Sequence, residues 1–121
     1  MALIISNLIQ GFKGFFNPAL LSVIASGQQI SAAFATGGME LVGVFIPAAF
    51  TGTTITFLAS TTLGGTYVPI SNAAGLVSYT VGASEYIAIN PQDFYGVAFL
   101  QIKSGSAEGA ARTLTISLKG L

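Results

Sequence analysis

Alternation of apolar and polar residues is the feature that most restricts how this chain can fold. In RTLTISLK (112–119), Leu114, Ile116 and Leu118 alternate with Thr, Ser and Lys. Successive side chains of a β-strand point to opposite faces, so this pattern predicts a strand with one buried face. The segment TTITFLAS (53–60) repeats the pattern, with its Ile, Phe and Ala on one side. Both segments therefore indicate strands that cover a hydrophobic core.

Further segments are rich in residues that suit a pleated sheet, and short turn sequences separate them. These segments are 20–26, 29–35, 39–46, 66–70, 76–81, 85–89 and 97–103. Glycine pairs such as Gly37–Gly38 supply the backbone conformations that tight turns need. Short strands at roughly ten-residue spacing predict an all-β domain, either an antiparallel sandwich or a barrel. One helical turn is expected in NPQDF, where Asn90 suits the N-cap and Pro91 the first helical position.

The last two strands are expected to form one β-hairpin, with a loop from Ser104 to Ala110. Glu108 and Arg112 then lie at or beside the loop tip, four residues apart. One interpretation is a solvated ion pair, which would contribute less than about 1 kcal/mol to stability. The other is a contact that fixes the register against a neighbouring subunit. The sequence leaves both interpretations open.

The beginning of the chain differs from the rest, and we predict an N-terminal arm at 1–19 and a β-sandwich domain at 20–121. The arm is apolar, interrupted by glycines, and ends near Asn17–Pro18, where a helix is disfavoured. Its aromatic residues, which are poorly suited to water, are Phe12, Phe15 and Phe16. The segment is either an extended or short-helical stretch packed on the core, or an arm that docks on a partner chain.

Charged residues are scarce, which limits the classes of partner. They make up 7% of the chain, against about 25% in a typical soluble domain, and the net charge is zero. Four basic residues are too few for a nucleic-acid surface, and no stretch has the roughly 20 apolar residues of a membrane-spanning helix. The surface is either weakly polar and in contact with water, or buried against other copies or other proteins. Zero net charge favours the second interpretation, a homo-oligomer or a larger assembly.

Groups that perform catalysis are also scarce. The chain contains no His, Cys or Trp, and its four acidic residues are far apart in the sequence. General acid–base catalysis needs His or two paired carboxylates, and a Ser nucleophile needs a base beside it. A calcium site usually needs several carboxylates close together in the sequence, and the chain has a single Asp. We therefore expect no enzymatic activity, no cofactor and no metal site.

An alternative function, a carbohydrate-binding module, is suggested by the four tyrosines of the chain: Tyr67, Tyr79, Tyr86 and Tyr95. Exposed tyrosines on a β-sandwich can stack on sugar rings. Packing at the edge of the core, with the hydroxyl reaching water or backbone, is the ordinary role of such residues. A carbohydrate- or receptor-binding module therefore stays the alternative hypothesis.

Two stretches of the chain resemble small uncharacterised structural proteins of tailed bacteriophages. They are IPAAFTGTTITFLASTTLGGTYVPISNAAGLVSYTV (46–81) and YIAINPQDFYGVAFLQIKSGSAEGAARTLTISLKG (86–120). In those proteins a PAAFTGT-x-ITF strand precedes a GGTY-x-P turn, a DF-x-G segment and a closing hairpin. Residues 1–38 have no such counterpart.

The resemblance implies a virion component with a jelly-roll-like sandwich, specifically a capsid decoration (cement) protein assembled in the host cytoplasm. Such proteins bridge neighbouring capsomers against the pressure of packaged DNA, which requires no catalytic group. The implied partners are the major capsid protein or other virion proteins, and the lack of cysteine suits a reducing cytoplasm. The residues expected at the interface are Phe12, Phe15 and Phe16, and then Glu108 and Arg112. The alternative is a receptor- or sugar-binding module of a phage tail or spike.

Overall fold

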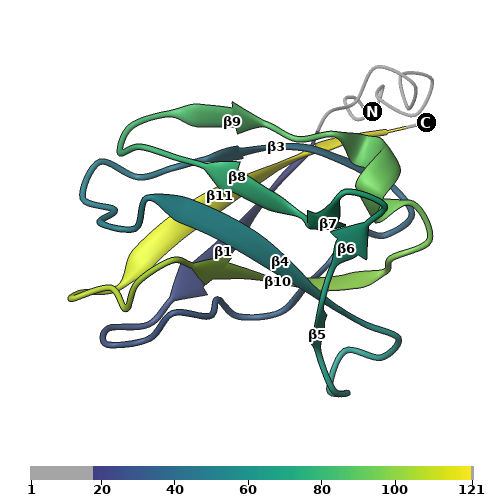
Figure 1. The fold of residues 1–121 in the computed structure, drawn as a ribbon, viewed down its shortest axis with the longest axis horizontal. Helices are drawn as coiled ribbons and strands as arrows, with labels where there is room; N and C mark the ends of the chain where they lie inside the picture. The colour runs from purple at the N-terminus through teal and green to yellow at the C-terminus, as the bar shows by residue number, and fades with distance from the viewer. Residues whose placement is uncertain (1–17, 121) are drawn as a thin grey trace, which may run out of the picture.

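The computed structural model describes residues 18–120, and within that range it contains β-strands and one short 3₁₀ helix (Figure 1). The strands are β1 (Ala19–Ile24), β2 (Phe34–Ala35), β3 (Glu40–Phe45), β4 (Thr54–Ser60), β5 (Val68–Pro69), β6 (Ser71–Asn72), β7 (Gly75–Leu76), β8 (Ser78–Thr80), β9 (Tyr86–Ala88), β10 (Phe99–Ser104) and β11 (Arg112–Lys119). The helix is η2 (Pro91–Phe94). The predicted all-β class is confirmed. The arm predicted at 1–19 lies almost wholly outside the described residues.

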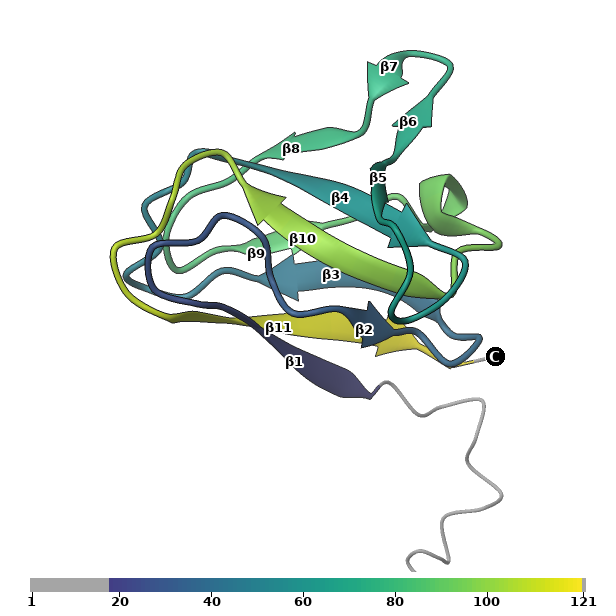
Figure 2. The same cartoon turned by 90° about the horizontal axis from the view of Figure 1, so that it is seen from below.

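Two antiparallel sheets pack face to face (Figure 2). One has the strand order β1-β11-β3-β9, and the other has the order β2-β10-β4, with β5 and β8 both paired to the far edge of β4. If β5 and β8 are taken as one interrupted edge strand, the principal strands number eight and the two orders become 1-8-3-6 and 2-7-4-5. This is the order of an eight-stranded jelly roll. The predicted sandwich is therefore confirmed at the level of strand order.

The interruption between β5 and β8 is the small hairpin β6–β7, which projects from the sandwich in Figure 2. The Ile70 N–H donates to the Phe57 carbonyl at 3.0 Å, and the Val77 N–H donates to the Ile70 carbonyl at 2.9 Å. These bonds hold the base of the hairpin against β4. Gly75 ends its turn with φ 115°, a conformation that glycine adopts without strain.

Apolar side chains from both sheets fill the space between them. The side chains with no exposed surface are Ile24, Val44, Ile55, Phe57, Leu100, Ile102, Leu114, Ile116 and Leu118. Phe57 packs edge-on against Phe94, with ring centroids 4.8 Å apart. The inward alternation predicted for 112–119 is thus confirmed, and so is the helical turn in NPQDF. There the Asn90 side chain accepts from the Gln92 N–H at 3.2 Å.

The prediction that the last two strands form one hairpin is wrong. β10 pairs with β2 and β4, whereas β11 lies between β1 and β3 in the other sheet. The loop 105–111 crosses from one layer to the other. Both strands bury alternate residues, but they do so from opposite sides of the core, which is why alternation alone did not separate the two arrangements.

The strand predicted at 29–35 is also mostly irregular. It makes isolated bridges, Ile24 with Ser31 and Ile30 with Lys103, before the two-residue strand β2. These bridges reach strands of different sheets, because the segment passes from one layer to the other. A chain that changes layers cannot keep one ladder of hydrogen bonds over its whole length.

Candidate functional site

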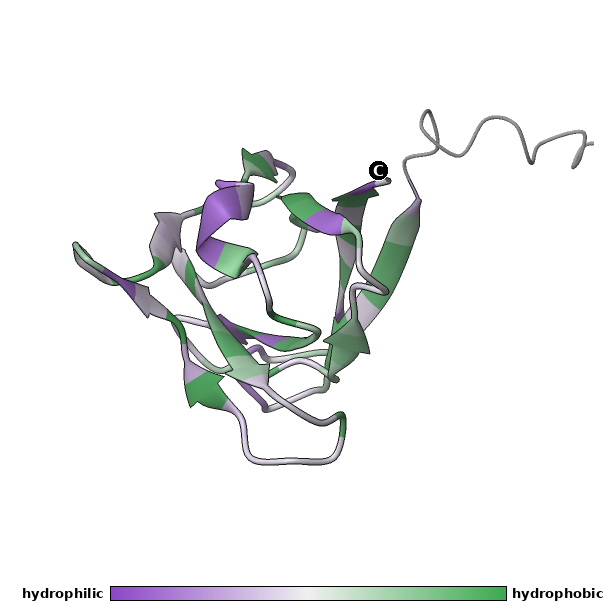
Figure 3. Cartoon of the chain, turned by 90° about the vertical axis from the view of Figure 1, so that its right-hand side faces the viewer, coloured by the Kyte–Doolittle hydropathy of each residue, from purple (hydrophilic) through white to green (hydrophobic). Residues whose placement is uncertain are grey.

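A row of exposed apolar side chains crosses the outside of the β1-β11-β3-β9 sheet. Leu21 pairs with Thr115, Thr115 with Phe45, and Phe45 with Tyr86. Residues directly opposite one another in neighbouring strands point to the same face. The four residues therefore form one continuous row, and we call this surface, with the rows on either side, the outer face. In Figure 3, β1, the strand next to the grey segment, is coloured mainly as hydrophobic.

The side chains of this row are far more exposed than core residues. The exposed fractions are 69% for Leu21, 51% for Phe45 and 45% for Tyr86, and Val23 in the next row is 41% exposed. The rings of Phe45 and Tyr86 lie with centroids 4.6 Å apart. Side chains of this size commonly anchor protein interfaces when they cluster on a surface.

Tyr86 is held flat against the sheet by its own contacts. Its hydroxyl donates to the Val42 carbonyl at 3.3 Å. Its ring covers Gly43, where an added Cβ would collide with the phenol. Glycine at this position therefore lets the tyrosine lie across β3, so the row is flat rather than a single projecting ring.

Within the outer face, the two rows that flank the central row are also uncharged. One consists of Val23 and Thr113, and the other of Ala19, Ser117, Gly43 and Ala88. Charge returns only at the end of the sheet, where Lys119 pairs with Glu40. The outer face is therefore a surface of apolar and hydroxyl groups, which loses less solvation free energy than a charged surface would when another protein covers it.

A buried carboxylate joins three loops at one end of the sandwich. The Glu108 side chain has no exposed surface and accepts five hydrogen bonds. Its Oε1 accepts from the Thr51 N–H and from Arg112 Nε, both at 2.9 Å. Its Oε2 accepts from the Thr51 hydroxyl and the Gly52 N–H at 3.0 Å, and from the Ser104 hydroxyl at 3.1 Å.

The backbone of Glu108 forms hydrogen bonds with a further loop, the one between β1 and β2. The Gly27 N–H donates to its carbonyl at 2.7 Å, and its own N–H donates to the Gln28 carbonyl at 3.0 Å. The loops β1–β2, β3–β4 and β10–β11 thus meet at one residue. Burial alone would raise the pKa of the Glu108 carboxyl, but the hydrogen bonds from Thr51, Arg112 and Ser104 outweigh it and lower the pKa from 4.5 to about 2.

This pKa shift predicts a loss of stability in acid. A carboxyl whose pKa falls on folding contributes fully above its unfolded value, and the contribution disappears as the pH falls from about 4.5 to about 2. The shift corresponds to about 3 kcal/mol of unfolding free energy. Urea titrations across this range should show the loss for the natural chain and a smaller loss for Glu108→Gln. Equal losses in both proteins would contradict the assignment to Glu108.

The interpretation of Glu108 and Arg112 as a solvated ion pair is therefore wrong, because the carboxylate is fully buried and Arg112 is only 14% exposed. The role of the pair at a subunit interface stays a prediction. Of the two side chains, only Arg112 has exposed surface with which it could contact a neighbouring subunit. The three phenylalanines predicted at the interface, Phe12, Phe15 and Phe16, lie outside the described residues.

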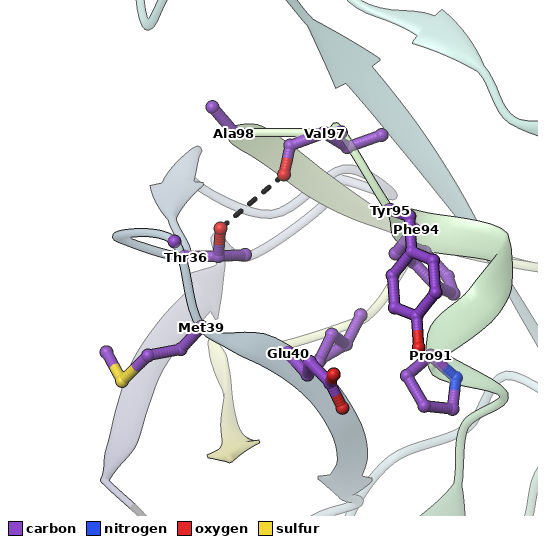
Figure 4. Close-up of a pocket in the computed structure, with 11 residues that line it drawn as sticks. Thr36, Met39, Glu40, Pro91, Phe94, Tyr95, Val97 and Ala98 are labelled. Atoms are coloured by element: carbon purple, nitrogen blue, oxygen red, sulfur yellow. Dashed lines mark hydrogen bonds between the residues drawn. The ribbon is translucent and has the colours of Figure 1, made fainter. Parts of the chain in front are cut away.

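A hollow of about 450 Å³ opens at the other end of the sandwich, and we call it the end hollow. It lies between the start of β3 and the segment that joins η2 to β10. Its walls include Met39, Leu41, Pro91, Phe94 and Val97. Its charged lining group is Glu40, whose carboxylate points toward the side formed by Pro91 and Tyr95 in Figure 4.

The tyrosines do not gather on one surface. Tyr79 packs edge-on against Phe57 in the core, with ring centroids 6.1 Å apart. Tyr86 lies on the outer face, and Tyr95, 61% exposed, borders the end hollow. These two lie at opposite ends of β3, because Tyr86 pairs with its last residue and Tyr95 shares the hollow with its first. These three rings therefore do not form a common platform for stacking a sugar. The fourth tyrosine, Tyr67, is half-buried, and its hydroxyl donates to the Leu63 carbonyl at 2.7 Å.

Within residues 18–120, no three acidic side chains come close enough together to hold a metal ion. No helix in the same range is long and apolar enough to span a membrane.

The comparisons with known proteins give a fold but no family. No protein-family model matches the sequence, and no curated protein does. The solved structure of the SPBc2 prophage-derived protein YomS is 17% identical, with 86% of this chain and 96% of that chain covered and a TM-score of 0.53. The Yersinia pseudotuberculosis-derived mitogen YPM is 10% identical, with 88% and 86% covered and a TM-score of 0.36. The likeness to YomS shows that the two proteins share a fold.

Proposed function

We propose that this chain is a non-enzymatic structural protein of a phage virion, specifically a capsid decoration protein that binds and stabilises capsomers. The observation that carries the proposal is the outer face, where large apolar side chains form a flat, uncharged row on the solvent side of one sheet of the jelly roll. The face has the composition of an interface centre, which is depleted in charge and enriched in aromatic residues. The shared fold with a prophage-derived protein and the sequence resemblance to phage structural proteins support the same function.

The partner of the outer face in this proposal is the major capsid protein, and copies of the chain associate around a capsid symmetry axis. Repetition of a modest interface over many symmetric copies gives strong overall attachment. Jelly rolls also occur in lectins, so the fold alone does not decide the function. The alternative, a receptor- or sugar-binding module, predicts glycan binding by a discrete oligomer that is weakened by Tyr95→Ala.

The test is cosedimentation of the purified full chain with capsids of the phage that encodes it. We expect saturable binding at a copy number set by capsid symmetry. Deletion of residues 1–17 should abolish binding yet leave the sandwich folded, because residues 18–120 contain all eight principal strands and the core. The cut precedes Pro18 because its carbonyl accepts from the Leu118 N–H at 3.0 Å. Unfolding of the shortened protein would show that residues 1–17 belong to the core. Absence of capsid binding by the full chain would overturn the proposed decoration function.

A further inference from the structure

We propose that the end hollow binds an arginine side chain of a different protein. This inference does not depend on the outer face or on the capsid. It rests on three features of the hollow: its size, its apolar and aromatic walls, and a single carboxylate at its side.

The hollow is large enough to admit one long side chain. Its volume of about 450 Å³ is within the range of small-ligand sites, roughly 300–1,000 Å³. Gly38 and Gly96 form part of its lining at φ 83° and 81°, and an added Cβ at either would meet nothing within 4 Å. Because other residues rarely adopt these angles, both positions stay free of side chains and the hollow stays open.

The polar groups of the wall are mostly used within the protein. The Thr36 hydroxyl donates to the Val97 carbonyl at 3.5 Å (Figure 4). The Thr36 N–H donates to the Ala98 carbonyl at 3.1 Å. Glu40 differs, because within residues 18–120 no ion pair or side-chain hydrogen bond to its carboxylate is formed. A formal negative charge therefore faces a hollow whose other walls are mainly apolar.

These surroundings favour a guanidinium over other cations. A metal ion needs several oxygen ligands, and the hollow has one carboxylate. A guanidinium is weakly hydrated, stacks on aromatic rings and can bind a carboxylate through two parallel hydrogen bonds. Here Tyr95 and Phe94 offer ring faces or edges, Glu40 offers the carboxylate, and Met39 and Val97 can contact the aliphatic part of the side chain.

The arginine must come from another protein. Arg112 is the only arginine of this chain, and its Nε donates to the buried Glu108. Lys119 is the one competitor on the same sheet, since it pairs with Glu40 in the strand register. Glu40 is half-buried whereas Lys119 is exposed, and no ion pair within 4.0 Å joins them in the described structure.

The test is a titration of the full chain with L-arginine amide, followed by NMR signals of Glu40, Tyr95 and the Met39 methyl group. We expect saturable shifts at these residues, at least about tenfold weaker binding in Glu40→Gln, and tighter binding in Lys119→Gln. Citrulline amide, the neutral isostere, should bind no better to the natural chain than to Glu40→Gln. Glu85→Gln, which removes an exposed carboxylate elsewhere, is the matched control and should bind as the natural chain does.

Several results would overturn the inference. They are absence of shifts well above millimolar arginine amide, equal binding of citrulline amide, equal binding of lysine amide, and unchanged affinity in Glu40→Gln. Shifts of the same residues by a neutral sugar alone would assign the hollow to glycan binding instead. None of these outcomes bears on the outer face, so the proposed function and this inference fail separately.

Discussion

Replacing Glu108 with glutamine is expected to lower the free energy of unfolding by about 3 kcal/mol or more. Both carboxylate oxygens accept hydrogen bonds, Oε1 from two donors and Oε2 from three. A glutamine has one acceptor oxygen, and its NH₂ group would face donors whichever way the amide is turned. The change leaves buried donors without acceptors and Arg112 without its counter-charge, which costs more than the loss of an ordinary hydrogen bond.

Glu85→Gln is the matched control for this measurement. Glu85 is exposed, and its carboxylate accepts from the Gly82 N–H at 2.9 Å. Its replacement should change stability by less than about 0.5 kcal/mol. Denaturant titrations at one protein concentration measure both variants. Similar losses in the two proteins would show that the Glu108 cluster does not stabilise the three loops.

Two lysines on the outer face are expected to weaken capsid binding at least about 100-fold in the variant Leu21→Lys/Phe45→Lys. Both side chains are more than half exposed, so the fold should tolerate the change. An interface that covers them would have to bury two ammonium groups beside apolar and hydroxyl groups that cannot neutralise them. The loss of apolar contact area adds to this cost.

The matched control has the same added charge at two other exposed residues. Leu63 and Leu76, in the β4–β5 loop and the β6–β7 hairpin, are each 55% exposed and lie away from the outer face. Leu63→Lys/Leu76→Lys should sediment with capsids as the natural chain does. Equal loss in both double variants would mean that charge in general, and not the outer face, controls binding.

Most strand positions could be predicted from the sequence, with the segment 29–35 as an exception, whereas strand partners could not. The apolar residues of β10 and β11, such as Ile102 and Ile116, alternate in the same way whether the two strands pair with each other or face each other across the core. The choice depends on contacts with β1, β3 and β4, which are distant in the chain. The alternation therefore shows which side of a strand is buried, but it does not show to which of the two sheets the strand belongs.

The interaction surfaces show the same limit. The sequence indicates a contact between Glu108 and Arg112 because they are four residues apart. Thr51 and Gly52, which also donate hydrogen bonds to the carboxylate, belong to another loop and could not be predicted as its partners. The outer face combines residues of four strands, and its large apolar side chains, Leu21, Phe45 and Tyr86, come from three of them. Its local signal was apolar residues on both sides of the strands, in LLSVI (20–24) and in VGVF (42–45). A strand with one face in the core needs apolar residues on that face only, so apolar residues on both faces indicate a second surface that is covered by a partner.

A cryo-electron microscopy reconstruction of virions of the phage that encodes this chain tests the central claim most directly. The proposed function predicts jelly-roll density on the capsid surface at symmetry-related positions, with Leu21, Phe45 and Tyr86 against the major capsid protein. Capsids without this density would contradict the decoration role. Density that contacts the capsid through the β2-β10-β4 sheet, with the outer face in solvent, would contradict the assignment of the interface.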